Sequence, residues 1–335
     1  MKTILVTGGA GFIGSNFIKL VLQKTDYSVI NLDKLTYAGN LENLKEIQNN
    51  PKYKFIKGDV SKEEDVNSLR DEDFNFIIHF AAESHVDRSI DSPNIFTITN
   101  VIGTQNLLNL AVEKDIIKFV QISTDEVYGS LGATGYFTEK TPLDPTSPYS
   151  ASKTAADLIA LAYHKTFGLN LNITRCSNNY GPYQFPEKLI PLMINNAKND
   201  ISLPVYGDGK NIRDWIYTED HCDAILMVME TGKNGEVYNI GGDSEKQNLE
   251  IIDIILHELG KPKSLIKFVE DRKAHDMRYA IDFTKISEEL GWKPKTSFAD
   301  GMKKTIKWYS DNQDWLDNVI SSEYKEYYKN MYEGK

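Results

Sequence analysis

Cysteine is scarce in this sequence of 335 residues, which contains only Cys176 and Cys222. Two cysteines are too few for a disulfide framework, and neither stands near histidines at the spacing of a metal site. The sequence therefore argues against a disulfide-stabilised scaffold, predicts no metal site, and leaves both cysteines as expected buried thiols.

Long hydrophobic runs are also missing. No stretch approaches the roughly 18 apolar residues of a membrane span. The first residues, MKTILVTGGAGFIG, lack the long apolar stretch and small-residue cleavage site of a signal peptide. We therefore expect a cytoplasmic protein without a membrane partner.

Basic residues are outnumbered, since 38 Lys and Arg against 48 Asp and Glu give a formal net charge of -10. This balance argues against a nucleic-acid partner, which needs clustered Lys and Arg. A small nucleotide ligand remains possible through local Arg and Lys side chains. The length and the 41% of hydrophobic residues suit a folded enzyme with two lobes.

Short apolar runs alternate with amphipathic segments through the first half of the chain. This alternation predicts an α/β fold with a doubly wound parallel (Rossmann) sheet. The expected helices include 12–23 and 248–259. The expected strands are Lys2 to Thr7, Tyr27 to Leu32, Tyr53 to Ile56, Phe74 to Phe80, Ile117 to Ile122 and Leu171 to Thr174.

The composition changes after about residue 175, where Pro, Gly and Asn become more frequent and turn motifs such as Tyr206 to Gly209 appear. We place the nucleotide-binding domain at 1–175 and a smaller C-terminal α/β substrate lobe at 176–335. The apolar run Glu236 to Ile240 predicts a strand that returns to the first sheet. The Tyr-rich segment Ser321 to Tyr332 predicts an amphipathic terminal helix.

Glycines at 8, 11 and 14 follow the first expected strand and lead into a helix. Gly8 permits a tight turn, Gly11 lets the backbone approach a pyrophosphate, and Gly14 lets helix and strand pack closely. Asp33 ends the second strand, where a carboxylate accepts hydrogen bonds from a ribose and repels a 2′-phosphate. The sequence therefore predicts NAD rather than NADP. Asp59, with Val60, either holds the adenine or caps a helix.

Tyr149 and Lys153 stand four residues apart, so on a helix they share one face. A phenol near its usual pKa of about 10 is a poor base at neutral pH, but a nearby ammonium and a positive cofactor ring stabilise its phenolate. The pair therefore predicts a base that removes a hydroxyl proton while hydride leaves the same carbon.

Thr124, Asp125 and Glu126 follow the apolar run Ile117 to Ile122, at a strand end where such sheets bind ligands. Neighbouring carboxyl groups can have their pKa values pushed apart, which leaves one as an acid and the other as a base. Elimination of water requires such a pair. The alternative interpretation is a solvated acidic turn.

The glycine fingerprint and the Tyr-Lys pair resemble those of the extended short-chain dehydrogenase/reductase family, over nearly the whole chain. The Thr-Asp-Glu triplet is similar to that of the family's hexose 4,6-dehydratases. The resemblance implies oxidation at C4 of a thymidine-diphosphate-linked glucose, elimination of water across C5 and C6, and reduction at C6, on a route to deoxysugars such as rhamnose. A substrate that carries a uridine or cytidine nucleotide instead of thymidine stays an open alternative. The cofactor contacts that it implies are Gly8, Gly11, Phe12, Ile13, Gly14, Asp33, Lys34, Leu35, Thr36, Asp59, Val60, Ala81, Ala82, Thr99, Tyr149, Lys153 and Asn179.

The resemblance also implies a nucleotide-sugar site and a homodimer built on two helices, roughly Ile95 to Val112 and Ser150 to Phe167. His85 is expected to be structural. The sequence departs from the family in 271–275, where Lys-Ala replaces a frequent Pro-Gly and leaves the loop conformation open. The implied substrate contacts are Ser84, Thr124, Asn178, Lys188, Leu189, Pro204, Tyr206, Arg213, Asn248, His275, Arg278 and Tyr279.

Two rival functions remain at this stage. The first is a nucleotide-sugar 4-epimerase or decarboxylase, which the paired carboxyl groups of Asp125 and Glu126 argue against. The second is a catalytically silent NAD-binding regulator, which would be expected to lack Tyr149 or Lys153, whereas both are present.

Overall fold

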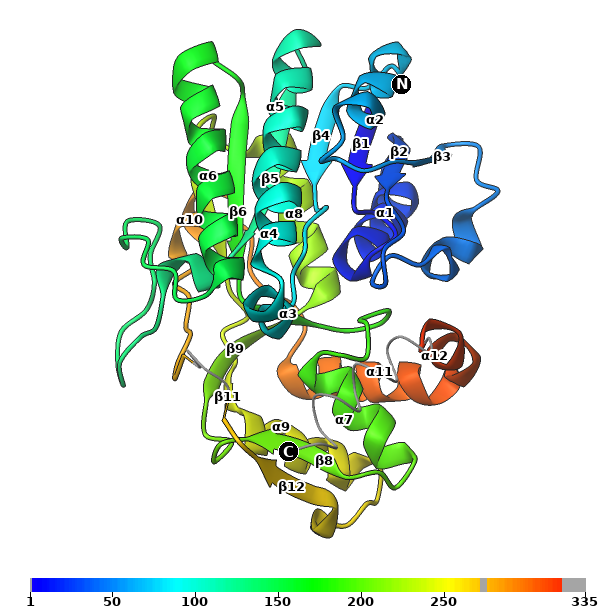
Figure 1. Cartoon of the computed structure of the whole chain (residues 1–335), viewed down its shortest axis with the longest axis vertical. Helices are drawn as coiled ribbons and strands as arrows, with labels where there is room; N and C mark the ends of the chain where they lie inside the picture. The colour runs from blue at the N-terminus through cyan, green and yellow to red at the C-terminus, as the bar shows by residue number, and fades with distance from the viewer. Residues whose placement is uncertain (1, 272–275, 321–335) are drawn as a thin grey trace.

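The computed structural model of the chain describes residues 2–271 and 276–320. The predicted terminal helix Ser321 to Tyr332 and most of the 271–275 loop, with His275, lie outside the described residues. The described part forms an upper lobe around a large sheet and a lower lobe around two small ones (Figure 1).

The upper lobe is built on a seven-stranded sheet in the order β10-β6-β5-β4-β1-β2-β3, and all of its neighbours pair in parallel. The predicted doubly wound parallel fold is confirmed. Its central strands β1, β4 and β5 are buried along nearly their whole length because both faces are covered by helices. The strands are β1 Thr3–Thr7, β2 Ser28–Asp33, β3 Tyr53–Lys57, β4 Phe76–His79, β5 Lys118–Thr124, β6 Leu171–Cys176 and β10 Val237–Ile240.

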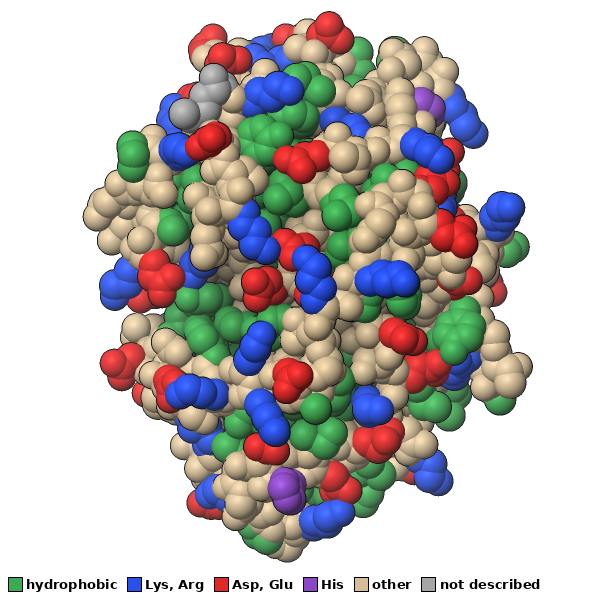
Figure 2. Space-filling model, turned by 180° about the vertical axis from the view of Figure 1, so that it is seen from behind, with side chains coloured by type: hydrophobic (Ala, Val, Ile, Leu, Met, Phe, Trp, Pro, Cys, Tyr) green, Lys and Arg blue, Asp and Glu red, His purple; other side chains and the backbone are tan. Residues whose placement is uncertain are grey.

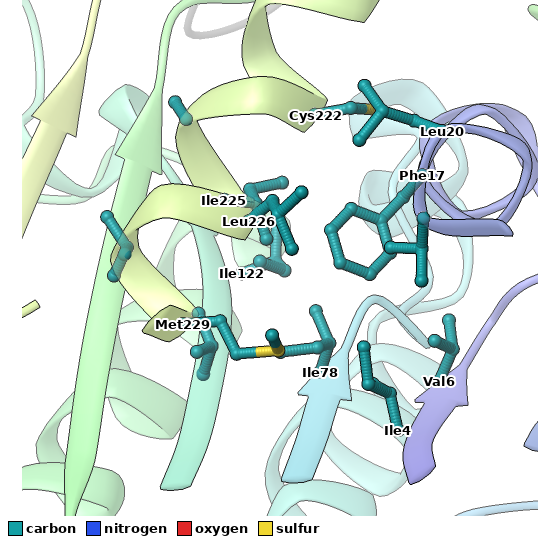
Figure 3. Packing of buried hydrophobic residues seen from close by; sticks show 14 of the residues in the cluster. Ile4, Val6, Phe17, Leu20, Ile78, Ile122, Cys222, Ile225, Leu226 and Met229 are labelled. Carbon is teal, nitrogen blue, oxygen red and sulfur yellow. The ribbon is translucent and has the colours of Figure 1, made fainter. Parts of the chain in front are cut away.

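Helices α1 (Phe12–Lys24) and α8 (Thr218–Thr231) pack against each other on one face of this sheet. Figure 3 shows Phe17 and Leu20 of α1 facing Cys222 and Ile225 of α8 above the strand side chains. The opposite face is covered by α2 (Glu63–Asn67), α5 (Gly103–Glu113) and α6 (Pro148–Phe167). Burial of this apolar surface from both sides is the main force that holds the sheet in place.

The expected single helix Ile95 to Val112 consists of three helical pieces. These are α4 (Pro93–Phe96), a π-helical stretch Thr97–Ile102, and α5. The π-helical stretch ends at Gly103, where a Cβ atom would meet Val60 Cγ2 at 2.6 Å. Glycine therefore lets this helical run pass close to the segment after β3. A short helix, α3 (Val86–Asp91), precedes it.

The lower lobe contains a three-stranded sheet, β11-β9-β7, and a two-stranded one, β12-β8. Its helices share an aromatic and aliphatic core that includes Tyr180, Trp215, Tyr309 and Trp315. Strand β10 belongs to the C-terminal half of the sequence but pairs with β6 of the large sheet. The division of the chain into two domains at residue 175 therefore stays a prediction. The elements are β7 Asn178–Tyr180, β8 Leu203–Tyr206, β9 Ile212–Tyr217, β11 Glu245–Gln247, β12 Ile266–Val269, α7 Leu189–Lys198, α9 Asn248–Glu258, α11 Phe298–Asp311 and α12 Gln313–Val319, with α10 Thr284–Leu290 packing on β10.

The surface mixes charges of both signs, as the rear face in Figure 2 shows. No helix in the described residues is long and apolar enough to cross a membrane. Within residues 2–271 and 276–320, no group of three or more His, Cys, Asp or Glu side chains is placed to hold a metal ion.

Candidate active site

The first cavity, of about 310 Å³, lies at the carboxyl ends of the large sheet, beside β1 and β4, between which the strand order reverses. Gly8 ends β1 with a φ of 72°, and a Cβ atom there would lie 2.6 Å from the Ala81 backbone nitrogen. A Cβ atom on Gly14 would lie 2.4 Å from the Gly8 carbonyl oxygen. Only glycine permits this close packing of strand, loop and helix at the ligand-binding edge of such a sheet.

Asp33 is buried at the end of β2, beside the glycine loop. Its carboxylate accepts hydrogen bonds from the backbone N–H groups of Ala10 and Leu35, each at 2.8 Å. Burial raises the pKa of Asp33, and these two hydrogen bonds oppose the rise. Since each carboxylate oxygen has two acceptor sites, one on each oxygen remains for a ligand hydroxyl in the cavity.

Asp59 caps a turn before α2 and lines the first cavity, while its predicted contact with the adenine stays a prediction. Its side chain accepts from the Ser61 backbone N–H at 3.0 Å and from the Ser61 hydroxyl at 2.7 Å, as a capping residue does. It also pairs with Lys34 Nζ at 2.8 Å, and both residues line the first cavity. Burial raises the pKa of Asp59, but the contacts with Lys34 and Ser61 outweigh it and leave the pKa below its ordinary value.

The structure brings nearly all of the expected cofactor contacts to this cavity. Leu35 is the exception, because its side chain packs against the core on the α1 side of the sheet and does not line the cavity. Its φ of 58° is left-handed, which points its N–H at Asp33. The residues placed on the lining are Gly8, Gly11, Phe12, Ile13, Gly14, Asp33, Lys34, Thr36, Asp59, Val60, Ala81, Ala82, Thr99, Tyr149, Lys153 and Asn179.

Tyr149 and Lys153 lie in the first turns of α6, and both line the cavity. A capping box between Ser147 and Ser150, with Pro148 in the first turn, starts the helix just before them. Lys153 Nζ donates to the Ile122 carbonyl at 2.6 Å, which fixes the ammonium under the end of β5. Burial lowers the pKa of Lys153, while the negative charge of Asp157 opposes that change.

Burial also raises the pKa of the Tyr149 phenol well above its ordinary value, and the charge of Glu126 raises it further. A hydrogen bond with Thr124 acts in the opposite direction. A positive charge beside the phenol is therefore needed before Tyr149 can act as a base near neutral pH.

Asp125 and Glu126 begin a 3-10 turn directly after β5, so the chain turns their carboxyl groups toward the cavity rather than along the strand. Thr124 joins them, because its hydroxyl donates to Asp125 Oδ1 at 3.2 Å and accepts from the Glu126 backbone N–H at 3.3 Å. Asp125 is only 1% exposed. Burial, followed by the charge of Glu126, raises the pKa of Asp125 well above its usual range. Asp125 is therefore suited to carry a proton beside Glu126.

A second cavity, of about 180 Å³, lies between this corner and the lower lobe. The two cavities share part of their lining, so a ligand in one meets a ligand in the other beside the carboxyl pair. The shared residues are Glu126, Asn178, Asn179, Gln184, Glu187 and Lys188.

Most of the expected substrate contacts line one of the two cavities. Ser84 and Thr124 line the first, and Asn178 and Lys188 line both. In the second cavity Arg213 stacks on the Tyr279 ring, with its guanidinium carbon 4.3 Å from the ring centroid. The remaining residues on the second lining are Leu189, Pro204, Tyr206, Arg213, Asn248 and Tyr279.

Arg278 departs from its expected position, because it lines neither cavity. Its guanidinium is paired with both oxygens of Glu245, at 2.7 and 2.8 Å. It also donates to the carbonyls of Gly132 and Gly135. These acceptors occupy its donors, so in this structure Arg278 ties β11 to the 130–137 loop rather than facing a phosphate.

A buried cluster around Glu187 was missed at the sequence level. Glu187 accepts hydrogen bonds from Tyr37 Oη at 3.2 Å and from Arg88 Nε at 3.3 Å, and it lines both cavities. His85 lies 4.0 Å from the same carboxylate. The cluster joins the loop after β2 and helix α3 to the segment before α7, so it fixes the lower lobe against the upper one.

The fold and the site together define a dinucleotide-binding α/β enzyme with a Tyr-Lys pair and a carboxyl pair between two cavities. A family model described as GDP-mannose 4,6 dehydratase matches residues 5–305. A curated dTDP-glucose 4,6-dehydratase of Xanthomonas campestris pv. campestris is 49% identical, with 97% of this chain and 98% of the relative covered.

Two solved structures are similar over nearly the whole chain. The dTDP-glucose 4,6-dehydratase of Bacillus anthracis, in complex with NAD, is 53% identical with a TM-score of 0.89, covering 95% of this chain and 100% of that one. That of Streptomyces venezuelae, with NAD and dTDP bound, is 50% identical with a TM-score of 0.92, covering 95% and 99%. The chain belongs to the GDP-mannose 4,6-dehydratase family of extended short-chain dehydrogenases/reductases.

Proposed function

We propose that this enzyme dehydrates dTDP-glucose to dTDP-4-keto-6-deoxy-glucose with bound NAD. The observation that carries the proposal is a buried Asp125 beside Glu126 where the two cavities meet. An epimerase needs no second carboxyl group there, since it moves no water. The named activities of the relatives and of the two similar structures support the same choice.

The residues of the first cavity suit NAD. The glycine loop leaves no side chain where a pyrophosphate approaches, and the start of α1 presents backbone N–H groups there. Asp33 keeps acceptor sites for a ribose diol, and its charge would repel the 2′-phosphate of NADP. When bound, NAD would supply a two-electron acceptor that takes a hydride from C4 and returns it to C6.

Tyr149, Lys153 and Thr124 serve the oxidation in this proposal. Tyr149 accepts the proton of the C4 hydroxyl. Lys153, held by the Ile122 carbonyl, supplies a positive charge that favours the phenolate. Thr124 contacts both Asp125 and the Glu126 backbone, which places its hydroxyl beside the carboxyl pair, and it holds the C4 oxygen once its O–H turns from Asp125 to the substrate.

Asp125 and Glu126 serve the elimination. A ketone at C4 makes the C5 hydrogen acidic, and Glu126 removes it. Asp125, whose pKa burial raises, gives its proton to the departing C6 hydroxyl, so one water leaves and a C5–C6 double bond forms. Reduction at C6 and return of a proton to C5 complete the 4-keto-6-deoxy sugar.

The second cavity holds the nucleotide diphosphate in this proposal, with Arg213 and Lys188 as its cationic contacts. Incubation with a panel of dTDP-, UDP- and CDP-glucose tests the function and the nucleotide together. The expected result is the alkali-induced ultraviolet absorbance of a 4-keto sugar, strongest with dTDP-glucose. Interconversion of glucose and galactose nucleotides without that absorbance would contradict the proposal.

A homodimer in the cytoplasm completes the proposal. Figure 1 shows α4, α5 and α6 together on the front of the upper lobe. Exposed large apolar side chains occur on α3, α4, the π-helical stretch Thr97–Ile102 and α6, and these segments contact one another. A contiguous face of this kind suits a partner subunit. Two free, buried cysteines fit a reducing compartment. The outward residues are Ile90 (39% exposed), Ile95 (40%), Ile98 (50%), Ile102 (42%) and Leu158 (54%).

Light scattering at micromolar concentration tests this assembly. Ile98→Glu is expected to lower the mass from dimer to monomer, because it places a charge in the middle of the apolar face. Phe268→Glu is the matched control, since Phe268 is 57% exposed on β12 in the other lobe. A monomeric wild-type protein would remove the dimer from the proposal.

A further inference from the structure

Asn43 connects the end of the chain to the glycine loop at its beginning. Its side chain is 2% exposed and lies in the 3-10 helix Leu41–Ile47. Asn43 Nδ2 donates to the Ala10 carbonyl at 2.8 Å. Its Oδ1 accepts from Trp315 Nε1 of α12, also at 2.8 Å. A single buried amide therefore joins α12 to the loop between β1 and α1.

The direction of these two bonds is fixed by Trp315. An asparagine amide can present either its oxygen or its nitrogen to a neighbour, but an indole N–H is only a donor. With the indole on one side, Asn43 must present its oxygen to Trp315 and its NH₂ group to Ala10. The opposite amide orientation would set the Asn43 oxygen against the Ala10 carbonyl oxygen and lose both hydrogen bonds.

Ala10 is the residue on which the wall of the first cavity is anchored. Its N–H donates to Asp33, and its carbonyl also accepts from the Asn40 backbone N–H at 3.0 Å. The segment just before Asn40 supplies Thr36, Ala38 and Gly39 to the lining of the cavity. The wall and the glycine loop are therefore joined at Ala10.

An aromatic cluster holds α12 in position for this contact. Tyr183 contacts both Trp308 and Trp315, with ring centroids at 4.6 and 5.9 Å, and the two indoles contact each other at 5.0 Å. Lys19 of α1 stands over the Tyr183 ring, 3.7 Å from its centroid. The indole of Trp315 therefore packs among three aromatic rings, which restricts its movement away from Asn43.

We infer that Trp315 is a positioning residue that slows the release of NAD, acting through Asn43 on the glycine loop and the 36–39 wall. The inference rests on the proposed binding of NAD. The proposed reaction oxidises and re-reduces the same molecule, so the cofactor does not need to leave between turnovers. A contact that holds the cavity wall in place does not obstruct the reaction.

The test is the dissociation rate of NAD from the holoenzyme, followed by exchange of radiolabelled NAD against excess unlabelled NAD. Trp315→Phe keeps an aromatic ring but loses the N–H and part of the ring volume, and Trp308→Phe reproduces the loss of volume without touching the N–H. Its dissociation rate is expected to rise about 3- to 10-fold, which corresponds to one buried neutral hydrogen bond. Trp308→Phe is the matched control, because it changes the same cluster and leaves the Trp315–Asn43 bond in place, and it is expected to release NAD at the wild-type rate.

A double-mutant cycle separates this contact from general loosening. Asn43→Ala should accelerate release, and adding Trp315→Phe to it should bring little further change, because both act through one hydrogen bond. Adding Trp308→Phe should leave the Asn43→Ala rate where it was. Equal acceleration by Trp308→Phe and Trp315→Phe, or independent multiplication of the Trp315 and Asn43 effects, would overturn the inference.

The holoenzyme itself separates this inference from the proposed function. A protein that binds no NAD at all would contradict the proposed cofactor. A protein that binds NAD and releases it at the same rate in the wild type and in Trp315→Phe would sink the positioning role alone. Circular dichroism and the unfolding midpoint of each variant show whether it is folded before its rate is used.

Discussion

Two aspartates are buried near β5, and they are stabilised in different ways. Asp157 on α6 is fully buried, and its Oδ2 accepts from Arg175 Nε at 2.9 Å and from the Ser123 hydroxyl at 3.0 Å. Asp125 is equally hidden, but its nearest charge is that of Glu126. Within residues 2–271 and 276–320, Asp125 Oδ2 and Asp157 Oδ1 both lack a hydrogen-bond partner, so the two aspartates differ in the charge that acts on them.

The difference separates an ion pair that supports the fold from an acid reserved for chemistry. A buried carboxyl group needs either a countercharge or a proton. Arg175 supplies the countercharge for Asp157, whereas burial raises the pKa of Asp125 and favours its protonated form. A protonated acid with one oxygen facing no protein donor can give its proton to a substrate.

The most severe loss of activity is expected for Tyr149→Phe. This change removes the group that accepts the C4 proton, so oxidation and all later chemistry should fall by about 10⁴-fold. Exchange of the C5 hydrogen with solvent deuterium, measured by mass spectrometry, should disappear as well. Persistent C5 exchange would place the first proton transfer outside Tyr149.

Glu126→Gln and Asp125→Asn should block later steps, each by about 10²- to 10⁴-fold in dehydration. Glu126→Gln should bind the nucleotide sugar and form some NADH, yet lose C5 exchange. Asp125→Asn should keep oxidation and some exchange while C6 hydroxyl loss becomes slow. Absorbance of reduced nicotinamide in a single turnover measures both. Full dehydration in both variants would reduce the pair to an acidic turn.

The same substitution at the two aspartates tests the comparison directly. Asp157→Asn leaves Arg175 buried without its countercharge and should cost about 3–5 kcal/mol in the free energy of unfolding. Asp125→Asn replaces a neutral acid by a neutral amide and should change stability by less than about 1 kcal/mol at low pH. Urea unfolding measures the stability of both variants. Equal losses of unfolding free energy would contradict the distinction between the two aspartates.

Asp33→Ala should weaken NAD binding by about 10- to 100-fold, since hydrogen bonds to a charged group are lost. NADP should be affected less, because its 2′-phosphate no longer meets the carboxylate. Isothermal titration with both cofactors measures the change in preference. Equal affinity of the wild type for NAD and NADP would show that Asp33 does not determine the preference for NAD.

The smallest expected effect is a pH dependence of the Asp125→Asn difference. The folded-state pKa of Asp125 lies above its unfolded value near 3.8. Between these two values the folded state binds more protons, so this group makes the wild type less stable as the pH rises. Asp125→Asn removes this pH-dependent loss of stability. Its stability relative to the wild type should therefore grow from pH 4 to pH 7, and a constant difference in urea unfolding would contradict the raised pKa.

The sequence predicted the large sheet and the reactive corner because both depend on neighbours in the chain. Gly8, Gly11 and Gly14 stand where no side chain fits, and Tyr149 and Lys153 lie one turn apart on one helix. Such constraints are visible in residue type and spacing alone.

Contacts between distant parts of the chain were not predictable in this way. Glu187 meets Tyr37 and Arg88, which lie 150 and 99 residues away. Arg278 was expected to contact the substrate because of the family resemblance, but its partner Glu245 lies 33 residues earlier and nothing local indicates the pairing. Asn43 and Trp315, which are 272 residues apart, form the extreme case.

The pairing of β10 with the edge of β6 also affects how the protein folds while it is being synthesised. A nascent chain that has reached residue 176 has six strands of the large sheet, but the outer edge of β6 still lacks its partner. An unpaired parallel edge can pair with another chain. On the ribosome, that edge stays open until residues 237–240 emerge, so we expect ribosome-bound chains arrested between these points to be the species most in need of a chaperone.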